Sequence, residues 1–295
     1  MAFLLALLML VPDLVPNGFG HLGSLLQTVV PWLGLGVPAV LLLAAVRRAP
    51  VAAVAALVPT LVWCSLFGGT VLGDRTGGGG DLTVVSHNVH DANPDPTGTA
   101  RALAASGAHV LALEELGPRT APVYERALAG SYPYHAVEGT VGIWSKYPLR
   151  EVRPVEIMPW TRALRATADT PQGELAVYVA HLASVRVSPG AGFLVERRNE
   201  SAARLAEAVR AEPLPRVLLL GDFNGATGDS ALAPLTDRFR SAQDEAGDGF
   251  GFTWPAAFPL VRIDQVLVRG VEPASAWTLP RTGSDHLPVA ASLRL

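Results

Sequence analysis

Two long apolar stretches near the start of the chain contain no charged side chain. They cover residues 25–46 and 49–73, and only Arg47 and Arg48 separate them. A helix of about 20 apolar residues crosses the hydrocarbon core of a bilayer. The alternative is a buried helical hairpin in a soluble protein, and uncharged runs of this length argue against it. The sequence therefore predicts two membrane-spanning helices within residues 1–76.

A third apolar run, residues 1–12, is too short to span a bilayer alone and lacks the basic start of a signal peptide. It is either the apolar part of a signal peptide or a truncated or tilted first helix, and we favour the second reading. The N-terminal region then has two to three helices. A Gly-rich linker follows at residues 77–81, and residues 82–295 are long enough for one large domain.

The charges beside the apolar runs predict an orientation. Positively charged loops stay in the cytoplasm, and Arg47 and Arg48 lie between the two predicted spans. The second helix, residues 51–72, then runs outward, so the domain lies outside the cytoplasm. The lone cysteine, Cys64, falls inside this helix, which leaves the exported domain without a thiol. We expect a multi-pass protein of the cell membrane with an extracytoplasmic domain.

The charge of the domain narrows the class of partner. Residues 81–295 hold 20 of the 23 basic side chains and 24 of the 26 acidic ones, so their net charge is −4. Proteins that bind nucleic acid usually carry a basic surface. The composition therefore argues against nucleic acid as the partner.

Short apolar stretches rich in β-branched residues recur along the domain, and a few amphipathic segments lie between them. The expected strands are residues 82–86, 110–113, 141–144, 164–168, 175–180, 216–220, 261–268 and 288–293. The expected helices are residues 99–106, 121–129 and 193–210. Many strands with few helices favour packed sheets flanked by helices over a doubly wound parallel sheet.

Six polar motifs stand at or near the ends of these apolar stretches. They are Ser-His-Asn at 86–88, Leu-Glu-Glu at 113–115, Ala-His-Leu at 180–182, Gly-Asp-Phe-Asn at 221–224, Arg-Ile-Asp at 262–264 and Ser-Asp-His at 284–286. Catalytic groups collect where strands leave the core of a protein. The motifs therefore predict one active site at the edge of the expected sheets.

Together the six motifs resemble the endonuclease/exonuclease/phosphatase superfamily, the deoxyribonuclease I-like metal-dependent phosphoesterases. The resemblance covers about residues 82–295, and the motifs occur in that family's order. It implies a four-layered α/β sandwich of two packed β-sheets flanked by helices, preceded here by the transmembrane helices. Glu114 is a departure, because the family more often has Gln before its metal-binding Glu. Glu115, the position of that metal-binding residue, is present.

A divalent cation would assist hydrolysis of a phosphate ester. Mg²⁺ is typically held by one or two carboxylates together with substrate phosphate. Glu115 is the first candidate, because it directly follows an apolar run and matches the family's metal-binding Glu. The resemblance adds Asn88 as a contact of the metal or its water, and Asp285 as a second carboxylate on the metal side. We expect Mg²⁺, with Mn²⁺ as a substitute.

The remaining motifs supply candidate catalytic groups. Asp222 and Asn224 are two residues apart, so their side chains share one face if the chain stays extended. The carboxylate would orient the attacking water and the carboxamide would hold a phosphate oxygen. His286 is the expected acid, base or phosphate-neutralising group, because imidazole titrates near neutral pH. The resemblance implies Asp264 as the partner of His286 and His181 as a second histidine at the phosphate.

Other polar residues near the motifs have two readings. Arg162 and Arg165 lie before or within the strand that precedes His181, and they either grip phosphate through paired N–H groups or are surface charges. His87 and His90 flank Asn88 but match no family position. We expect these two histidines to be structural or exposed.

The class of substrate depends on the surroundings of the site. Apolar segments at 157–160, 192–194 and 250–260 fall in predicted loops near the motifs, where they either form an apolar rim for a lipid tail or pack as ordinary loops. Membrane helices followed by an exported domain of this family resemble the teicoplanin-resistance membrane phosphatases. That resemblance implies a phosphorylated lipid substrate, undecaprenyl or another polyprenyl pyrophosphate, and the bilayer as partner.

Two other functions stay open. One is an extracytoplasmic nuclease or a phospholipid or sphingomyelin phosphodiesterase. The other is a domain that binds phosphate esters without hydrolysing them, which the intact motifs argue against. No obligate protein partner is inferred.

Overall fold

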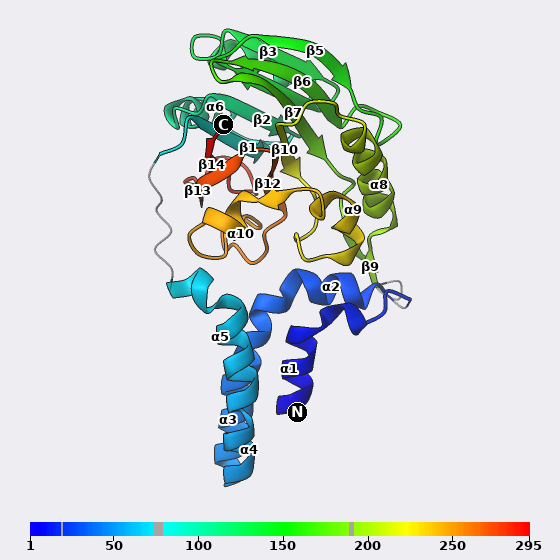
Figure 1. Cartoon of the computed structure of the whole chain (residues 1–295), viewed down its shortest axis with the longest axis vertical. Coiled ribbons are helices and arrows are strands. Elements are labelled where there is room, and N and C mark those ends of the chain that lie inside the picture. The colour runs from blue at the N-terminus through cyan, green and yellow to red at the C-terminus, as the bar shows by residue number, and fades with distance from the viewer. Residues whose placement is uncertain (19, 73–78, 189–191) are drawn as a thin grey trace.

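Two six-stranded β-sheets pack face to face in the C-terminal part of the chain (Figure 1). The structure is a computed structural model that describes residues 1–18, 20–72, 79–188 and 192–295. The first sheet contains β1 (Leu82–Asn88), β2 (Val110–Glu114), β3 (Tyr134–Glu138), β4 (Val141–Ser145), β13 (Glu272–Thr278) and β14 (Val289–Arg294). The second contains β5 (Leu149–Pro154), β6 (Ala163–Thr170), β7 (Gly173–His181), β10 (Val217–Asp222), β11 (Arg240–Ser241) and β12 (Asp264–Arg269). Their orders are β13-β14-β1-β2-β4-β3 and β11-β12-β10-β7-β6-β5.

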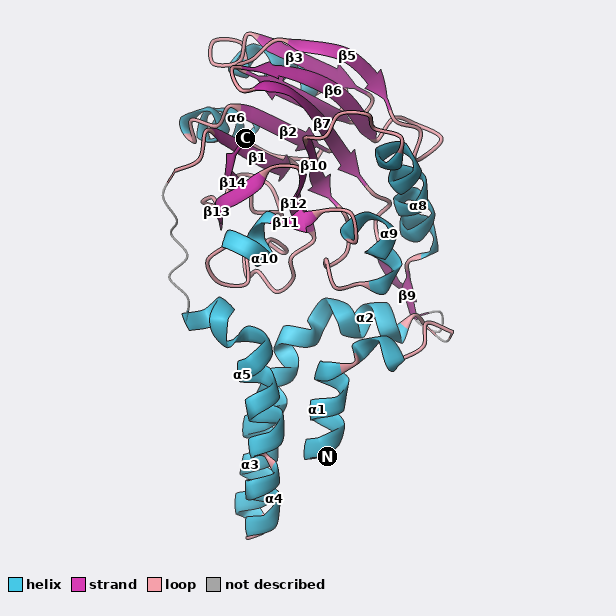
Figure 2. Ribbon diagram, in the orientation of Figure 1, coloured by secondary structure: helices cyan, strands magenta, loops and turns pink. Residues whose placement is uncertain are grey.

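Helices cover the outer faces of both sheets (Figure 2). The first sheet carries α6 (Pro96–Ala105) and α7 (Ala121–Leu128), and the second carries α8 (Glu196–Arg210) and α9 (Ala233–Thr236). Smaller elements are η3 (Ser230–Leu232), α10 (Ala242–Ala246) and a two-stranded sheet of β8 (Arg186–Ser188) and β9 (Gly192–Leu194). The predicted four-layered α/β sandwich is therefore confirmed.

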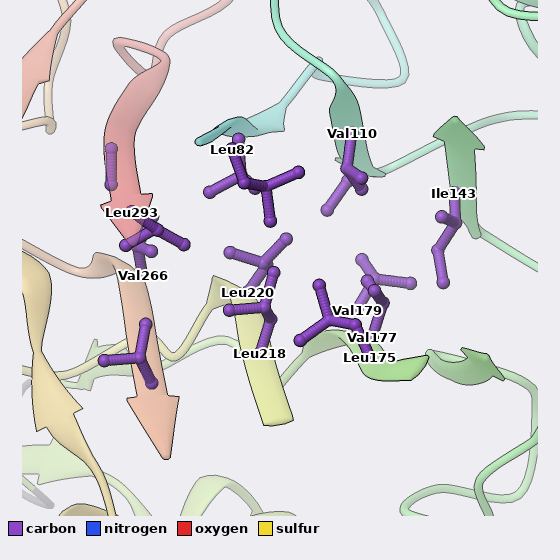
Figure 3. Close-up of a cluster of buried hydrophobic side chains, with 14 of the residues drawn as sticks. Leu82, Val110, Ile143, Leu175, Val177, Val179, Leu218, Leu220, Val266 and Leu293 are labelled. Carbon is purple, nitrogen blue, oxygen red and sulfur yellow. The ribbon is translucent and has the colours of Figure 1, made fainter. Parts of the chain in front are cut away.

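The core between the sheets is made of aliphatic side chains that alternate along each strand (Figure 3). In β10, Leu218 and Leu220 face the first sheet, whereas Val217 and Leu219 face the helices on the outer side. Because both faces of β10 are buried, its sequence is a continuous apolar run. Each such side chain stabilises the fold by about 1.5–3 kcal/mol through burial.

The predicted strands are all present, with shifted ends. The strand expected at 261–268 begins only at Asp264, because residues 261–263 belong to a loop in which Val261 forms a bridge with Trp254. The helix expected at 193–210 begins at Glu196, because Phe193 and Leu194 pair in β9. The edge strands β3 and β5 were not expected from the sequence, since they are largely exposed and lack an apolar face.

Short helical elements make up the N-terminal region: α1 (Ala2–Leu10), η1 (Pro12–Leu14), α2 (Leu22–Val29), η2 (Val30–Leu35), α3 (Gly36–Val46), α4 (Pro50–Ala55) and α5 (Leu57–Leu72). Two continuous helical segments, Leu22–Val46 and Pro50–Leu72, are long and apolar enough to cross a membrane. Only 11% of each is buried, unlike the core helices of a soluble protein. Part of the predicted linker, residues 77 and 78, lies outside the described residues.

The first of these segments is not straight, in contrast to the prediction. Figure 1 shows α2 lying across the lower face of the β-sandwich, whereas α3 runs away from it beside α5. The change of direction falls at η2, a 3-10 turn that contains Pro31, which cannot donate a backbone hydrogen bond. With 11 residues, α3 is about 16 Å long, whereas the hydrocarbon core of a bilayer is about 30 Å thick. It would therefore not cross a bilayer without η2, the turn that precedes it.

Candidate active site

Strand register brings five of the polar motifs to one edge of the two sheets. In the first sheet, Asn88 at the end of β1 is paired with Glu114 at the end of β2. In the second, Asp222 at the end of β10 lies between His181 of β7 and Asp264 of β12. The loop before β14 adds the sixth motif. We call the resulting group the polar cluster: Asn88, Glu115, His181, Asp222, Asn224, Asp264, Asp285 and His286.

Unusual backbone angles at the strand ends turn these side chains into the site. Glu115 has a φ of +59° and Asn224 a φ of +48°, both rare for residues other than glycine. Gly221 has a φ of +146°, and a Cβ there would lie 1.9 Å from the carbonyl oxygen of Ala180. Such angles persist where the surrounding structure fixes them, and they are common at functional sites.

Asp222 is held by the two carboxamide residues of the cluster. Asn88 Nδ2 donates to Asp222 Oδ2 at 3.0 Å, and the backbone N–H of Asn224 donates to Asp222 Oδ1 at 2.8 Å. Burial raises the pKa of Asp222, and the nearby charge of Asp264 raises it further. The prediction that Asp222 and Asn224 share one face required an extended chain, and this condition is not met because the chain turns at Asn224. Both residues nevertheless line the same cavity.

His286 and Asp264 form a buried pair. The Nδ1 atom of His286 lies 2.9 Å from Asp264 Oδ2, and its Nε2 atom lies 3.9 Å from Asp222 Oδ2. Burial alone would lower the pKa of His286, but the Asp264 carboxylate outweighs this effect, and the pKa rises to about 10. The imidazole is therefore protonated at neutral pH and oriented by a fixed carboxylate.

His181 lies at the centre of the cluster. Its Nε2 atom is 3.7 Å from Glu115 Oε1 and 3.5 Å from Asp222 Oδ2, and it is buried without a hydrogen-bond partner. Burial lowers the pKa of His181 well below its usual value, and the charge of Arg162 adds to this effect. An uncharged imidazole whose Nε2 atom has no protein partner leaves that nitrogen for a ligand.

Glu115 and Asp285 lie on either side of His90. The Nδ1 atom of His90 is 3.6 Å from Glu115 Oε2 and 3.5 Å from Asp285 Oδ1. Ligand atoms of His90, Asp91 and Glu115 lie within 4.8 Å of one another. This partly exposed group of carboxylate oxygens fits a hard cation such as Mg²⁺.

Asn88 and Asp285 differ in detail from their predictions. The Oδ1 atom of Asn88 already accepts the backbone N–H of His90 at 3.1 Å, so the expected metal contact would use the second lone pair of that oxygen. Asp285 lies in the loop before β14. It faces His90 and the indole N–H of Trp254, while His286 turns the other way toward Asp264.

The two histidines that flank Asn88 have different surroundings. His87 is buried, its Nε2 atom lies 2.9 Å from Thr282 Oγ1, and burial lowers its pKa to about 3, which fits the predicted structural place. His90 is not a remote residue, because it contacts the two carboxylates of the expected metal site. Sequence analysis missed it, although its position two residues beyond Asn88 in the same loop was a signal.

Glu114 and Glu115 are adjacent but lie in opposite environments. Glu114 is fully buried, and its Oε1 atom accepts the hydroxyl of Ser86 at 3.0 Å. Burial raises the pKa of Glu114 well above its usual value, and the charge of Asp264 raises it further. A protonated carboxyl group is uncharged and can donate a hydrogen bond, as a Gln carboxamide does. The departure from the family pattern is therefore small in chemical terms.

The two candidate phosphate-binding arginines separate in the structure. Arg162 is partly buried, donates to the carbonyl oxygen of His181 at 3.0 Å, and lines a cavity together with Glu115. Arg165 does not join the polar cluster. Its guanidinium binds Glu212 through two hydrogen bonds of 3.0 Å and also contacts Glu151, so its predicted role in phosphate binding is wrong.

We expect Arg165→Met to destabilise the fold. Glu212 would remain buried with one partner fewer, and breaking a buried ion pair in this way costs about 3–5 kcal/mol. Arg150→Met is the matched control, because Arg150 pairs with Asp169 at the surface, where such pairs contribute about 0–1 kcal/mol. Denaturant unfolding of both variants measures the difference. A stable Arg165→Met protein with a raised KM would instead return Arg165 to substrate binding.

Comparison with known proteins agrees with this geometry. A model described as the Endonuclease/Exonuclease/phosphatase family matches residues 68–286. A search of curated proteins found no match.

Solved structures share the fold at low sequence identity. Danio rerio TDP2 in complex with a single-strand DNA product is 20% identical, with a TM-score of 0.61 over 72% of this chain and 99% of that chain. A mannosyl-6-phosphatase of Bacteroides thetaiotaomicron is 17% identical, with a TM-score of 0.60 over 73% and 100%. A Staphylococcus aureus beta toxin mutant with bound magnesium ions is 17% identical, with a TM-score of 0.57 over 72% and 99%.

Proposed function

Because this chain belongs to the endonuclease/exonuclease/phosphatase family, whose members are metal-dependent hydrolases of phosphate ester bonds, we propose that it dephosphorylates a lipid pyrophosphate. The expected substrate is undecaprenyl or another polyprenyl pyrophosphate, and the expected metal is Mg²⁺. Residues 1–76 anchor the enzyme in the cell membrane, and the domain at 82–295 carries the active site on the extracytoplasmic side.

The observation that carries this proposal is the apolar surface beside the polar cluster. Trp160 lines a cavity with Glu115 and His181, and Phe193 and Trp254 line a second cavity that includes other members of the cluster. All three side chains belong to the apolar segments expected to form a rim. Ligand pockets of this composition bind an apolar group and orient it through a few polar contacts.

The polar cluster supplies the groups that hydrolysis of a phosphate bond requires. When bound at Glu115 and Asp285, Mg²⁺ would neutralise charge on the phosphate. We assign Asp222 as the carboxylate that orients and deprotonates water, because its pKa is raised above that of an ordinary carboxylate. Protonated His286 donates a hydrogen bond to phosphate, His181 and Asn224 hold its other oxygens, and Asn88 contacts the metal or its water.

A nuclease or lipid phosphodiesterase is the second candidate. It is favoured by the fold shared with a protein solved with a single-strand DNA product. The net charge of −4 on residues 81–295 disfavours the nuclease reading, because a negatively charged domain repels the negatively charged backbone of nucleic acid.

Three substrates compared side by side test the proposal. Purified full-length protein with Mg²⁺ is given undecaprenyl pyrophosphate, sphingomyelin or DNA, and inorganic phosphate, phosphocholine and oligonucleotides are measured. We expect inorganic phosphate from the first substrate alone, and its loss after chelation and return with added Mg²⁺. The Glu115→Gln protein, purified in parallel, controls for a contaminating phosphatase. Release of phosphocholine or oligonucleotides at a higher rate would replace the proposal by the corresponding alternative.

The proposed orientation predicts the result of a reporter fusion. A reporter enzyme that is active only after export, joined after Leu295, should be active, because Arg47 and Arg48 hold their loop in the cytoplasm. Replacing both arginines by Asn should reduce this activity, since it removes the positive charges between the two apolar segments. Activity from a cytoplasmic reporter alone would reverse the topology and exclude an extracytoplasmic substrate.

A further inference from the structure

A cavity of about 390 Å³ connects the polar cluster with the N-terminal region. Its polar lining includes Glu115, Asp222, Asn224, Asp285 and His286. Its apolar lining consists of Leu25, Val29, Val185, Phe193, Trp254, Val261 and Ile263. Leu25 and Val29 belong to α2, the helix that lies across the lower face of the sandwich (Figure 1). One wall of the cavity therefore comes from the segment expected to act only as an anchor.

Polar contacts fix α2 to the domain. Ser24 Oγ donates to Asp229 Oδ1 at 3.1 Å, and the backbone N–H of Ser230 donates to Gln27 Oε1 at 3.1 Å. Ser24 and Gln27 are buried, whereas Leu22 is exposed. The helix thus turns polar side chains to the protein and Leu22 outward, whereas a surface helix of a soluble protein turns its apolar side chains inward.

Two tryptophans, Trp32 and Trp63, make contacts at the bend that follows α2. In η2, which follows α2 directly, Trp32 donates its indole N–H to the carbonyl oxygen of Leu260 at 2.7 Å and stacks on Phe252. Trp63 of α5 donates to the carbonyl oxygen of Pro31. Tryptophan is enriched at the boundary between bilayer and water. In the proposed membrane-anchored enzyme, the wall of the cavity formed by α2 would lie next to this boundary.

We infer that α2 forms part of the binding site for the hydrocarbon chain of the substrate, with Leu25 and Val29 in contact with the part of the chain nearest the phosphate. This inference rests on the proposed lipid phosphatase function. A hydrocarbon chain fits because the cavity combines an apolar wall with the groups that would hold phosphate, and because the outer face of α2 is itself apolar. The N-terminal region then selects the substrate in addition to anchoring the domain.

Substitutions in α2 test this inference. Leu25→Gln and Val29→Asn place a carboxamide in the apolar wall, and kcat/KM is measured in detergent for undecaprenyl pyrophosphate and for short-chain geranyl pyrophosphate. We expect the ratio of the long-chain to the short-chain value to fall about tenfold, because a polar group without a partner disfavours the apolar chain. Leu22→Gln is the matched control, since Leu22 is an exposed leucine of the same helix that does not line this cavity.

A larger apolar residue provides a second, independent variant. Val29→Trp keeps the wall apolar but fills part of the cavity, so we expect the preferred chain length to become shorter. Unchanged ratios in all of the cavity variants, or the same fall in Leu22→Gln, would overturn the inference while leaving the lipid phosphatase function intact. A wild-type protein that hydrolyses neither pyrophosphate would instead overturn the proposed function, and the inference with it.

Discussion

Replacing Glu115 by Gln is expected to abolish hydrolysis while leaving the fold intact. The carboxamide keeps the shape of the side chain but removes the negative charge that would hold Mg²⁺ beside Asp285 and His90. Loss of the metal removes several kcal/mol of transition-state stabilisation. A loss of about 4 kcal/mol corresponds to a rate decrease of about 1,000-fold. Steady-state hydrolysis over a range of Mg²⁺ concentrations measures the effect.

Glu114→Gln is the matched control, because it makes the same chemical change at the neighbouring residue. Glu114 is buried and its pKa is raised well above the usual value, which favours the uncharged carboxyl group, and Gln preserves the hydrogen-bonding capacity of that form. We expect this variant to retain most of the activity. Similar losses in the two variants would show that the site depends on the whole Glu-Glu pair, and wild-type kinetics in Glu115→Gln at saturating Mg²⁺ would exclude Glu115 as a ligand.

The second large effect is expected at the Asp264–His286 pair. Asp264→Asn removes the charge that raises the pKa of His286, and the new carboxamide favours the wrong tautomer of the imidazole. Turnover should therefore fall by about 100-fold or more. His286→Ala should be at least as damaging. The double variant should be little worse than His286→Ala, because residues that act as a unit are not additive. Losses that add on a logarithmic scale would show that the two side chains act independently.

The same pair predicts a dependence on pH. The pKa of His286 rises from 6.5 to about 10 in the folded protein, so the stability that the protonated imidazole contributes is complete below pH 6.5 and is lost as the pH rises through about 10. In Asp264→Asn the folded-state pKa of His286 is lower, so this loss of stability should occur at lower pH and should be smaller. The alkaline limb of the activity profile should shift in the same direction. Thermal unfolding and kcat, each measured across this range, test the two expectations.

Sequence patterns predicted the fold because each strand carries its own signal. The run before Asp222 is apolar on both faces, and the run before Asn88 is apolar at Leu82, Val84 and Val85, as expected for strands buried between a second sheet and a helical layer. Parallel register then places the ends of neighbouring strands together, which is why motifs far apart in the sequence form one group. The exposed edge strand β3 carries no such signal, because its burial is low along its whole length.

Other features depended on contacts that no local pattern encodes. The positions of His90 and Asp285 follow from loop conformations, and the positive φ of Glu115 cannot be inferred from its residue type. Arg165 is neither of its two predicted alternatives, a phosphate-binding group or a surface charge, because its partner Glu212 lies 47 residues further on and is buried with it. The docking of α2 before the bend at η2 includes a hydrogen bond between Ser24 and Asp229, which are separated by 205 residues.

For the proposed lipid phosphatase, the docking of α2 would also determine which concentration governs the reaction. With the cavity beside a helix at the membrane boundary, a lipid substrate would arrive by lateral diffusion within the leaflet instead of from bulk solution. The rate should then follow the mole fraction of substrate in the membrane, and dilution with inert lipid at constant total substrate should slow the enzyme. The released phosphate is water-soluble and leaves into solution, whereas the lipid monophosphate formed with it would stay in the leaflet and share the route by which the next substrate enters.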